Sequence, residues 1–167
     1  MRVGITGHQR LVDPQSWDWV HQEIRKTLAS LTPPVVGVSS LAIGADTTFA
    51  QIVLELGGSL SIVLPFIEYE QTFSSTESKQ EYQRLLRAAA TIEVLSGRET
   101  NEESFYAAGK RVVDLSELLI VVWDGKAARG LGGTADIAAY AREHRKRSIW
   151  LNPEARITSD LNVIGEL

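Results

Sequence analysis

Residues 35–50, VVGVSSLAIGADTTFA, contain the pattern that decides the fold. A short β-branched apolar run, Val35–Val38, is followed by a turn of small residues, and Gly44 and Asp46 then open a helix. Brief apolar runs of this kind are typical of parallel strands that helices cover on both faces. A strand that passes through serine and glycine into a helix leaves backbone N–H groups unpaired and aligned, which favours an anion.

The same construction recurs later in the chain, at Gly130–Asp136 (GLGGTAD). This glycine-rich turn follows the most hydrophobic strand that we expect, Leu118–Trp123, and leads into an alanine-rich helix, Thr134–His144. Two anion-type turns in one small protein predict a ligand that carries phosphate.

Strand-like and helix-like patterns alternate along the rest of the chain. Further strands are expected at Arg2–Thr6, Ser59–Leu64, Thr91–Leu95 and Ser148–Leu151. Helices are expected from Asp13-Pro14 to Leu31, from Asp46 to near Gly57, and over Lys79–Ala90 and Glu102–Glu117. The polar, poorly periodic residues 66–80 are expected to form a mobile loop, and residues 151–167 a weakly patterned tail. The alternation predicts one three-layer α/β domain over residues 1–167, with a mostly parallel sheet and helices on both faces.

Composition restricts the classes of partner. Seventeen basic against twenty-one acidic residues give a net charge of −4, which argues against a protein built to hold a nucleic-acid backbone. The chain contains no cysteine, and His8, His21 and His144 do not have the spacing of metal ligands, so we expect no metal and no cofactor. No apolar run approaches the ~20 residues of a membrane span, and MRVGITG is typical of a strand rather than a signal peptide. We expect a soluble, cytoplasmic protein with no membrane partner.

Ligands of parallel sheets bind in the crevice outside the carboxyl ends of the strands. Polar and glycine residues of this chain collect in the loops that are expected at that edge. The candidate ligand-binding residues are Gly7, His8, Arg10, Ser39, Ser40, Gly44, Asp46, Asp114, Trp123, Gly132, Gly133 and Thr134.

For some of these candidates, the residue type indicates which role to expect. Gly132 and Gly133 let a backbone approach a phosphate closely, and we favour that role over a plain loop because two anion-type turns share one edge. Arg10 suits a phosphate or a base, since guanidinium groups bind planar acceptors in a bidentate way. His8 is more often structural than catalytic in such a position. Trp123 is placed either to stack on a base or to pack in the core.

The carboxylates have two interpretations each. Asp46 either binds a ribose hydroxyl or ties its loop to its own helix. Asp114 is either a partly buried structural group or a ligand contact. Asp136 lies in the first turn of its helix, where it complements the helix dipole. Asp46 and Asp136 are the weak candidates for a catalytic group, and the catalytic residues stay unknown.

The order of the loops resembles the SLOG superfamily, which joins DNA-processing protein A (Smf), the lonely-guy cytokinin-activating enzymes and small stand-alone relatives. VSSLAIGAD at 38–46 is similar to the SGLARGID-type loop of that family, and LGGSLSIVLP at 56–65 to the strand that follows it. KRVVDLSELLIVVWDG at 110–125 and GLGGTADIAAYAREHRK at 130–146 are similar to the closing half, which contains a second phosphate loop. MRVGITGHQR at 1–10 resembles the opening of the small stand-alone members.

This resemblance covers about residues 1–151 and implies a Rossmann-like fold with a nucleotide-type ligand in the crevice. The positions that it carries over are Gly7, Ser39, Ser40, Gly44, Asp46, Asp114, Gly132, Gly133 and Thr134. Lonely-guy hydrolases have a glutamate three residues after the threonine of GGxGTxxE, where this chain has Ile137. Asp136 lies one position short, roughly 100° away around a helix.

We predict that the protein binds a small nucleotide or nucleotide-derived ligand, as a sensor or carrier. One alternative is a lonely-guy type phosphoribohydrolase, an N-glycosidase that removes the base from a nucleoside 5′-monophosphate. The other is a DNA-processing-like module for single-stranded DNA, although the acidity of the chain makes nucleic acid an unfavourable partner. Enzymatic activity is left undecided, and assembly into a homo-oligomer is left open.

Overall fold

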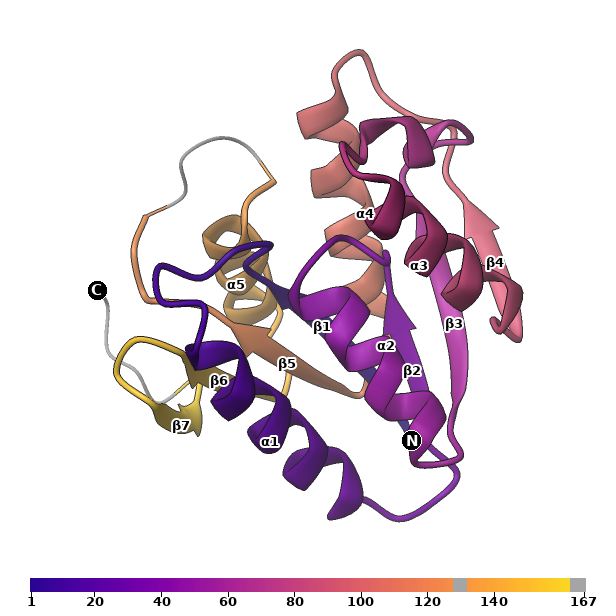
Figure 1. Ribbon diagram of the computed structural model, residues 1–167. Coiled ribbons are helices and arrows are strands. Elements are labelled where there is room, and N and C mark those ends of the chain that lie inside the picture. Colours follow the sequence, from indigo (N-terminus) through magenta and orange to yellow (C-terminus); the bar gives the residue numbers. More distant parts are fainter. Residues whose placement is uncertain (128–131, 163–167) are drawn as a thin grey trace.

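The computed structural model describes residues 1–127 and 132–162, which form one seven-stranded sheet with helices on both faces (Figure 1). The strands are β1 (Arg2–Gly7), β2 (Val36–Ser39), β3 (Ser59–Leu64), β4 (Thr91–Val94), β5 (Leu118–Val122), β6 (Ser148–Asn152) and β7 (Ile157–Asp160). The helices are α1 (Ser16–Ala29), α2 (Ala45–Glu55), α3 (Thr76–Arg87), α4 (Asn101–Leu115) and α5 (Thr134–Glu143), with a short 3₁₀ helix η1 (Tyr69–Thr72).

The sheet has the strand order β4-β3-β2-β1-β5-β6-β7. All neighbouring strands pair in parallel except β6 and β7, which are antiparallel. The chain moves outward from β1 to β4 on one side and then crosses to β5 on the other. The strand order therefore reverses beside β1, and such a switch point is where open α/β sheets bind ligands.

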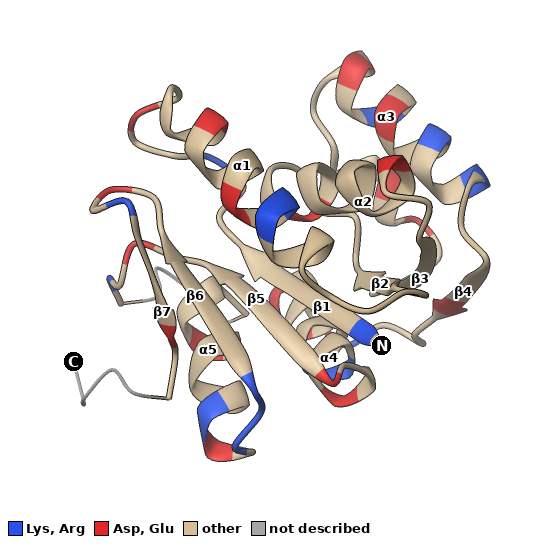
Figure 2. Ribbon diagram, turned by 90° about the horizontal axis from the view of Figure 1, so that it is seen from below, with Lys and Arg blue, Asp and Glu red and all other residues tan. Residues whose placement is uncertain are grey.

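Two apolar layers hold the helices to the sheet. Helices α1, α2 and α3 pack on one face and α4 and α5 on the other, as Figure 2 shows from below. Strand β5 contributes to both layers, because Leu118, Ile120 and Val122 face the first and Leu119 and Val121 the second. Its unbroken apolar run is thus explained by burial on both faces, and the predicted α/β class is confirmed.

The first helix begins later than the sequence indicated. Asp13 was expected as its cap, but α1 begins at Ser16. The Asp13 carboxylate accepts hydrogen bonds from the backbone N–H of Gln15 at 3.0 Å and the hydroxyl of Ser16 at 3.3 Å. Asp13 thereby stabilises a turn in front of the helix rather than the helix end itself.

The expectation of a loop over residues 66–80 was wrong. This segment contains η1, and α3 already begins at Thr76, where the hydroxyl of Ser75 accepts the N–H of Ser78 at 3.1 Å. Tyr69 and Phe73 are almost completely buried. Phe66 also packs against the core, where its ring contacts Tyr69 and Phe105. A polar segment with three anchoring aromatic residues shows little periodicity, yet those residues fix it over the sheet.

The expected tail also contains structure. Residues 157–160 form β7, whose Ser159 lies opposite Trp150 of β6. The Asn152 side chain closes the turn between them by accepting the N–H groups of Glu154 and Ala155, each at 3.0 Å. Polar residues of an edge strand do not produce the apolar pattern of a central one, so the sequence did not indicate β7. Residues 163–167 lie outside the described part of the chain.

Candidate ligand-binding cleft

A cavity of about 1050 Å³ lies at the carboxyl edge of the sheet, beside the switch point. Its wall comes from the loop after β1, the start of α2, the segment after β3, one face of α4, the loop after β5, the start of α5 and the turn between β6 and β7. The volume lies at the upper end of the range for small-molecule sites and is sufficient for an entire small ligand.

The start of α5 forms one side of this cavity, through Gly132, Gly133 and Thr134. Gly132 has a φ of +83°, and a Cβ there would lie 2.8 Å from the carbonyl oxygen of Glu102, so this position requires glycine. The N–H groups of residues 133–135 form no hydrogen bond with a described residue. Because first-turn N–H groups have no acceptor within the helix, they are available to an anion in the cavity. Gly130 and Leu131, which the predicted phosphate loop includes, lie outside the described residues.

Asp136 fixes this turn from behind. Its carboxylate accepts the N–H of Gly132 at 2.8 Å and does not line the cavity. The next residue, Ile137, is 2% exposed and its side chain occupies the space beside Gly109 of α4. The position where lonely-guy hydrolases have a glutamate therefore presents an apolar side chain to the cavity wall.

In the turn between β2 and α2, a side-chain carboxylate of the protein itself occupies the position of an anion. The Asp46 carboxylate accepts the hydroxyl of Ser39 at 2.9 Å and the N–H of Ser40 at 3.0 Å, and Asp46 is 6% exposed. The N–H of Leu41 donates to the Ser39 hydroxyl at 2.9 Å. These bonds tie the loop to its own helix, which is the second of the two roles considered for Asp46.

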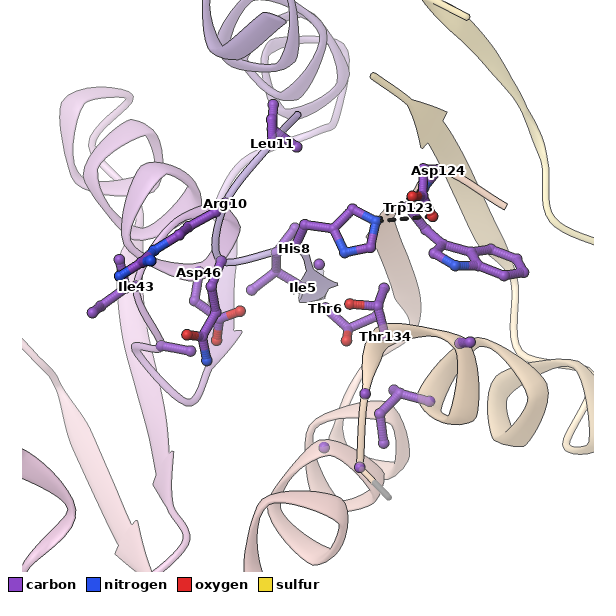
Figure 3. A pocket seen from close by; sticks show the side chains of 18 of the residues that line it. Ile5, Thr6, His8, Arg10, Leu11, Ile43, Asp46, Trp123, Asp124 and Thr134 are labelled. Carbon is purple, nitrogen blue, oxygen red and sulfur yellow. Dashed lines mark hydrogen bonds and ion pairs between the residues drawn. The ribbon is translucent and has the colours of Figure 1, made fainter. Parts of the chain in front are cut away.

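Burial makes the Asp46 carboxyl unusual. Loss of solvent raises its pKa from 3.8 to about 6, although the hydrogen bonds from Ser39 and Ser40 act in the opposite direction. Figure 3 shows Asp46 at the cavity wall, on the same side as Arg10 and Ile43. Asp46 is therefore a wall carboxylate whose charge changes near neutral pH.

Gly44 and Gly7 shape the wall where β1 meets α2. Gly44 has a φ of +89°, and a Cβ on it would lie 2.6 Å from the carbonyl oxygens of His8 and Gln9. The carbonyl of His8 accepts the N–H of Ala45 at 3.2 Å. Gly7 lines the cavity directly, whereas Gly44 and Ser39 support its wall from behind.

His8 and Asp124 face each other across the switch point, as the dashed line in Figure 3 shows. The Nε2 atom of His8 lies 3.1 Å from the backbone nitrogen of Asp124 and 3.1 Å from its Oδ1. In the neutral ring, Nε2 either accepts the backbone N–H, with the proton on Nδ1, or carries the proton itself and donates it to the Asp124 carboxylate. In the charged ring both nitrogens carry protons. Nδ1 has no hydrogen-bond partner among the described residues, and it is a donor when Nε2 accepts the backbone N–H or when the ring is charged.

Asp124 is held in its ionised form by its neighbours. Burial acts to raise the pKa of its carboxyl, but hydrogen bonds from the backbone of Lys126 and from His8 outweigh this and lower the pKa below its ordinary value. The Lys126 ammonium also forms an ion pair with Glu154 of the β6–β7 turn at 2.7 Å.

Trp123 and Arg10 both line the cavity, but only the side chain of Trp123 is held by interactions with described residues. The Trp123 indole is 9% exposed, donates to the carbonyl of Lys126 at 2.8 Å and packs against Trp150 with ring centroids 6.2 Å apart. The indole therefore packs against the core, and stacking on a base stays a prediction. Arg10 is exposed and forms no ion pair or hydrogen bond with a described residue, so its guanidinium is available to a ligand.

Asp114 is not brought to the cavity. It is exposed on α4, where its carboxylate accepts the hydroxyl of Tyr140 at 2.9 Å. The candidates that do line the cavity together are Gly7, His8, Arg10, Ser40, Asp46, Trp123, Gly132, Gly133 and Thr134.

Several wall residues were not foreseen. The segment after β3 contributes Tyr69 and Phe73, α4 contributes Phe105, and the β6–β7 turn contributes Glu154 and Arg156. The aromatic residues four apart at positions 69 and 73 were the available signal in a segment that otherwise looked like a loop. Over the described residues, no three histidine or acidic side chains cluster to hold a metal. The same residues include no helix of the length and apolar character needed to cross a membrane.

A mostly parallel sheet with its cavity at the switch point defines a Rossmann-like α/β protein. DNA processing protein A (DprA) from Streptococcus pneumoniae has a similar structure, with a TM-score of 0.63 and 20% identity, over 89% of this chain and 49% of that one. The Moco Carrier Protein from Chlamydomonas reinhardtii is similar with a TM-score of 0.50 and 21% identity, over 92% of this chain and 78% of that one. The chain therefore shares a Rossmann-like fold with these two proteins.

The likeness establishes the fold alone, because both identities are low. This chain spans about half the length of the DprA chain that it resembles. No protein-family model matches the sequence, and no curated protein matches it significantly.

Proposed function

We propose that the protein binds a small nucleotide or nucleotide-derived ligand, as a sensor or carrier. One observation at the start of α5 carries this proposal. The backbone N–H groups of residues 133–135 form no hydrogen bond with a described residue, and these residues line a cavity of about 1050 Å³. A phosphate accepts several such N–H groups at once and is stabilised by the helix dipole.

The charges on the cavity wall support an anionic ligand. The carboxylates of Asp46, Asp124 and Glu154 are each engaged, by Ser39 and Ser40 in the first case and by Lys126 in the other two. Arg10 is not paired with any described residue, and the Nδ1 atom of His8 has no partner among them either. The uncommitted polar groups of the wall are thus mostly donors, which suit the oxygens of a phosphate or a base.

The hydrolytic alternative has less support. Asp136 is used to hold the turn before α5, Asp46 is used to hold the turn before α2, and the position of the hydrolase glutamate is the buried Ile137. N-glycosidic cleavage requires a carboxylate that is free to approach the sugar, and neither aspartate has that freedom.

The test combines calorimetry with product analysis. The four common nucleoside 5′-monophosphates are titrated into the protein, and each mixture is then chromatographed for free base. We expect at least one of them to bind saturably with one site per chain and to be recovered intact. Absence of binding by all four would contradict the proposal. Base release that disappears in Asp136→Asn would favour the hydrolase.

A further inference from the structure

Part of the cavity wall is an aromatic patch that includes residues of the segment after β3. This aromatic annex is formed by Ile43, Tyr69, Thr72, Phe73 and Phe105, all of which line the cavity. Tyr69 packs edge-to-face against Phe73 with ring centroids 5.1 Å apart and against Phe105 at 5.9 Å. Rings interlocked in this way have few alternative positions, so the annex is a rigid apolar surface.

One polar group in the annex has no hydrogen-bond partner among the described residues. Tyr69 is 4% exposed, and its hydroxyl forms no hydrogen bond with a described residue. Among the described residues, however, no fully enclosed side-chain polar atom lacks a partner. The small exposed part of Tyr69 therefore includes its hydroxyl, and Tyr69 is one of the residues that line the cavity.

The surroundings keep this hydroxyl protonated. Burial raises the pKa of Tyr69 well above its ordinary value, and the nearby charge of Asp46 raises it further. A buried tyrosine hydroxyl normally has a hydrogen-bond partner, because leaving it without one costs free energy. A donor without a described partner on an apolar part of a cavity wall is the arrangement expected of a group that a ligand satisfies.

We propose that the aromatic annex is the subsite for a planar nitrogen heterocycle of the ligand, and that Tyr69 donates a hydrogen bond to an acceptor on that ring. Aromatic side chains offer the flat apolar contact that such a ring needs. The other aromatic residue considered for this role, Trp123, is packed against Trp150 and its indole N–H is already used. This inference rests on the proposed function. It adds a position for the base of a nucleotide whose phosphate is bound at the start of α5.

Tyr69→Phe tests the inference because it removes the hydroxyl and leaves the ring. The matched control is Tyr82→Phe, since Tyr82 belongs to the same aromatic cluster but does not line the cavity. Calorimetry uses two probes, the nucleoside 5′-monophosphate that the unmodified protein binds most tightly and ribose 5-phosphate, which has no base. Circular dichroism checks that both variants fold.

We expect Tyr69→Phe to weaken the nucleotide by about 3- to 10-fold, the size of one hydrogen bond, while ribose 5-phosphate changes less than about twofold. Tyr82→Phe should change neither. If Tyr69→Phe and the unmodified protein bind the nucleotide with equal affinity, the annex is not the base subsite, while the proposed function still stands. Equal weakening of both probes would also overturn the annex. Failure of the unmodified protein to bind any nucleotide would overturn both.

Discussion

Two aspartates of this protein accept hydrogen bonds from the turns that precede their own helices. Asp46 takes the N–H of Ser40, and Asp136 takes the N–H of Gly132. Their oxygens occupy donors that a bound anion would otherwise use. After this internal bonding, the N–H groups of residues 133–135 remain without a described partner. A sequence pattern that predicts an anion site does not show whether the chain itself supplies the anion.

Asp46 gives stability a definite pH dependence. Its folded-state pKa of about 6 lies above the unfolded value of 3.8, so the folded protein binds this proton more tightly. The contribution of Asp46 to the free energy of unfolding therefore falls as pH rises from 3.8 toward 6. Between about pH 4.5 and 7.5 the loss is up to ~2 kcal/mol.

Urea unfolding at these two pH values measures the effect. Asp46→Asn should show a smaller decrease in stability between them than the unmodified protein does. Asp18→Asn, which alters an exposed carboxylate on α1, is the control and should not differ from the unmodified protein. An identical decrease in all three proteins would show that Asp46 does not titrate in this range.

His8 is predicted to bind the ligand through Nδ1 rather than through Nε2. Asparagine places an amide nitrogen near the position of Nδ1, whereas glutamine reaches the position of Nε2. We expect His8→Asn to retain affinity for a nucleoside monophosphate within about threefold and His8→Gln to lose about tenfold. Calorimetric titration compares them. The opposite order would mean that His8 acts only by holding Asp124.

Among the elements, the strands and helices of the sheet core could be predicted from apolar patterning. Ser59–Leu64 agrees at both ends with β3, and the other central elements differ at their ends by a few residues at most. The segment after β3 and strand β7 could not be predicted in this way. Their positions depend on contacts that are distant in sequence, such as Tyr69 with Phe105 and β7 with β6. The local apolar periodicity of a sequence does not indicate such contacts.

The start of α5 permits a direct test by substitution. Gly133 has a φ of −71° and a ψ of 170°, which any residue adopts, so Gly133→Val should fold. Its side chain would stand where a phosphate approaches the backbone, and we expect nucleotide binding to be lost. Ala139→Val adds a similar bulk on an exposed position of the same helix and should bind normally. Unchanged affinity of Gly133→Val in calorimetry would exclude a phosphate at this turn.

Across the whole molecule, the sequence predicted the layers, the mostly parallel sheet and the edge where a cavity lies. It also predicted most of the polar residues on the cavity wall, since loops that follow parallel strands meet at one edge. The exceptions have physical causes. Asp114 lies on the outer face of α4 and bonds Tyr140, while the aromatic annex comes from a segment without periodicity.

The charge of the whole molecule argues for a small ligand over DNA. Acidic residues outnumber basic ones, and Figure 2 shows the two kinds interspersed along α3. We expect a labelled single-stranded oligonucleotide at ~150 mM salt to bind no more tightly than the 10⁻⁴–10⁻⁶ M of non-specific binders. Fluorescence polarisation measures this. Submicromolar binding that Gly133→Val leaves unchanged would support the DNA-processing analogy instead.

The most direct test of the central claim is an amide NMR spectrum of the ¹⁵N-labelled protein during titration with a nucleoside 5′-monophosphate. If the cavity binds the phosphate at the start of α5, the amide signals of Gly133, Thr134 and Ala135 should shift most, with smaller shifts at His8 and Tyr69. Signals from the opposite edge of the sheet should stay in place. Residues 142–147, REHRKR, form a largely basic run at the end of α5. Shifts confined to that run, or no shifts at saturating nucleotide, would contradict phosphate binding at the start of α5.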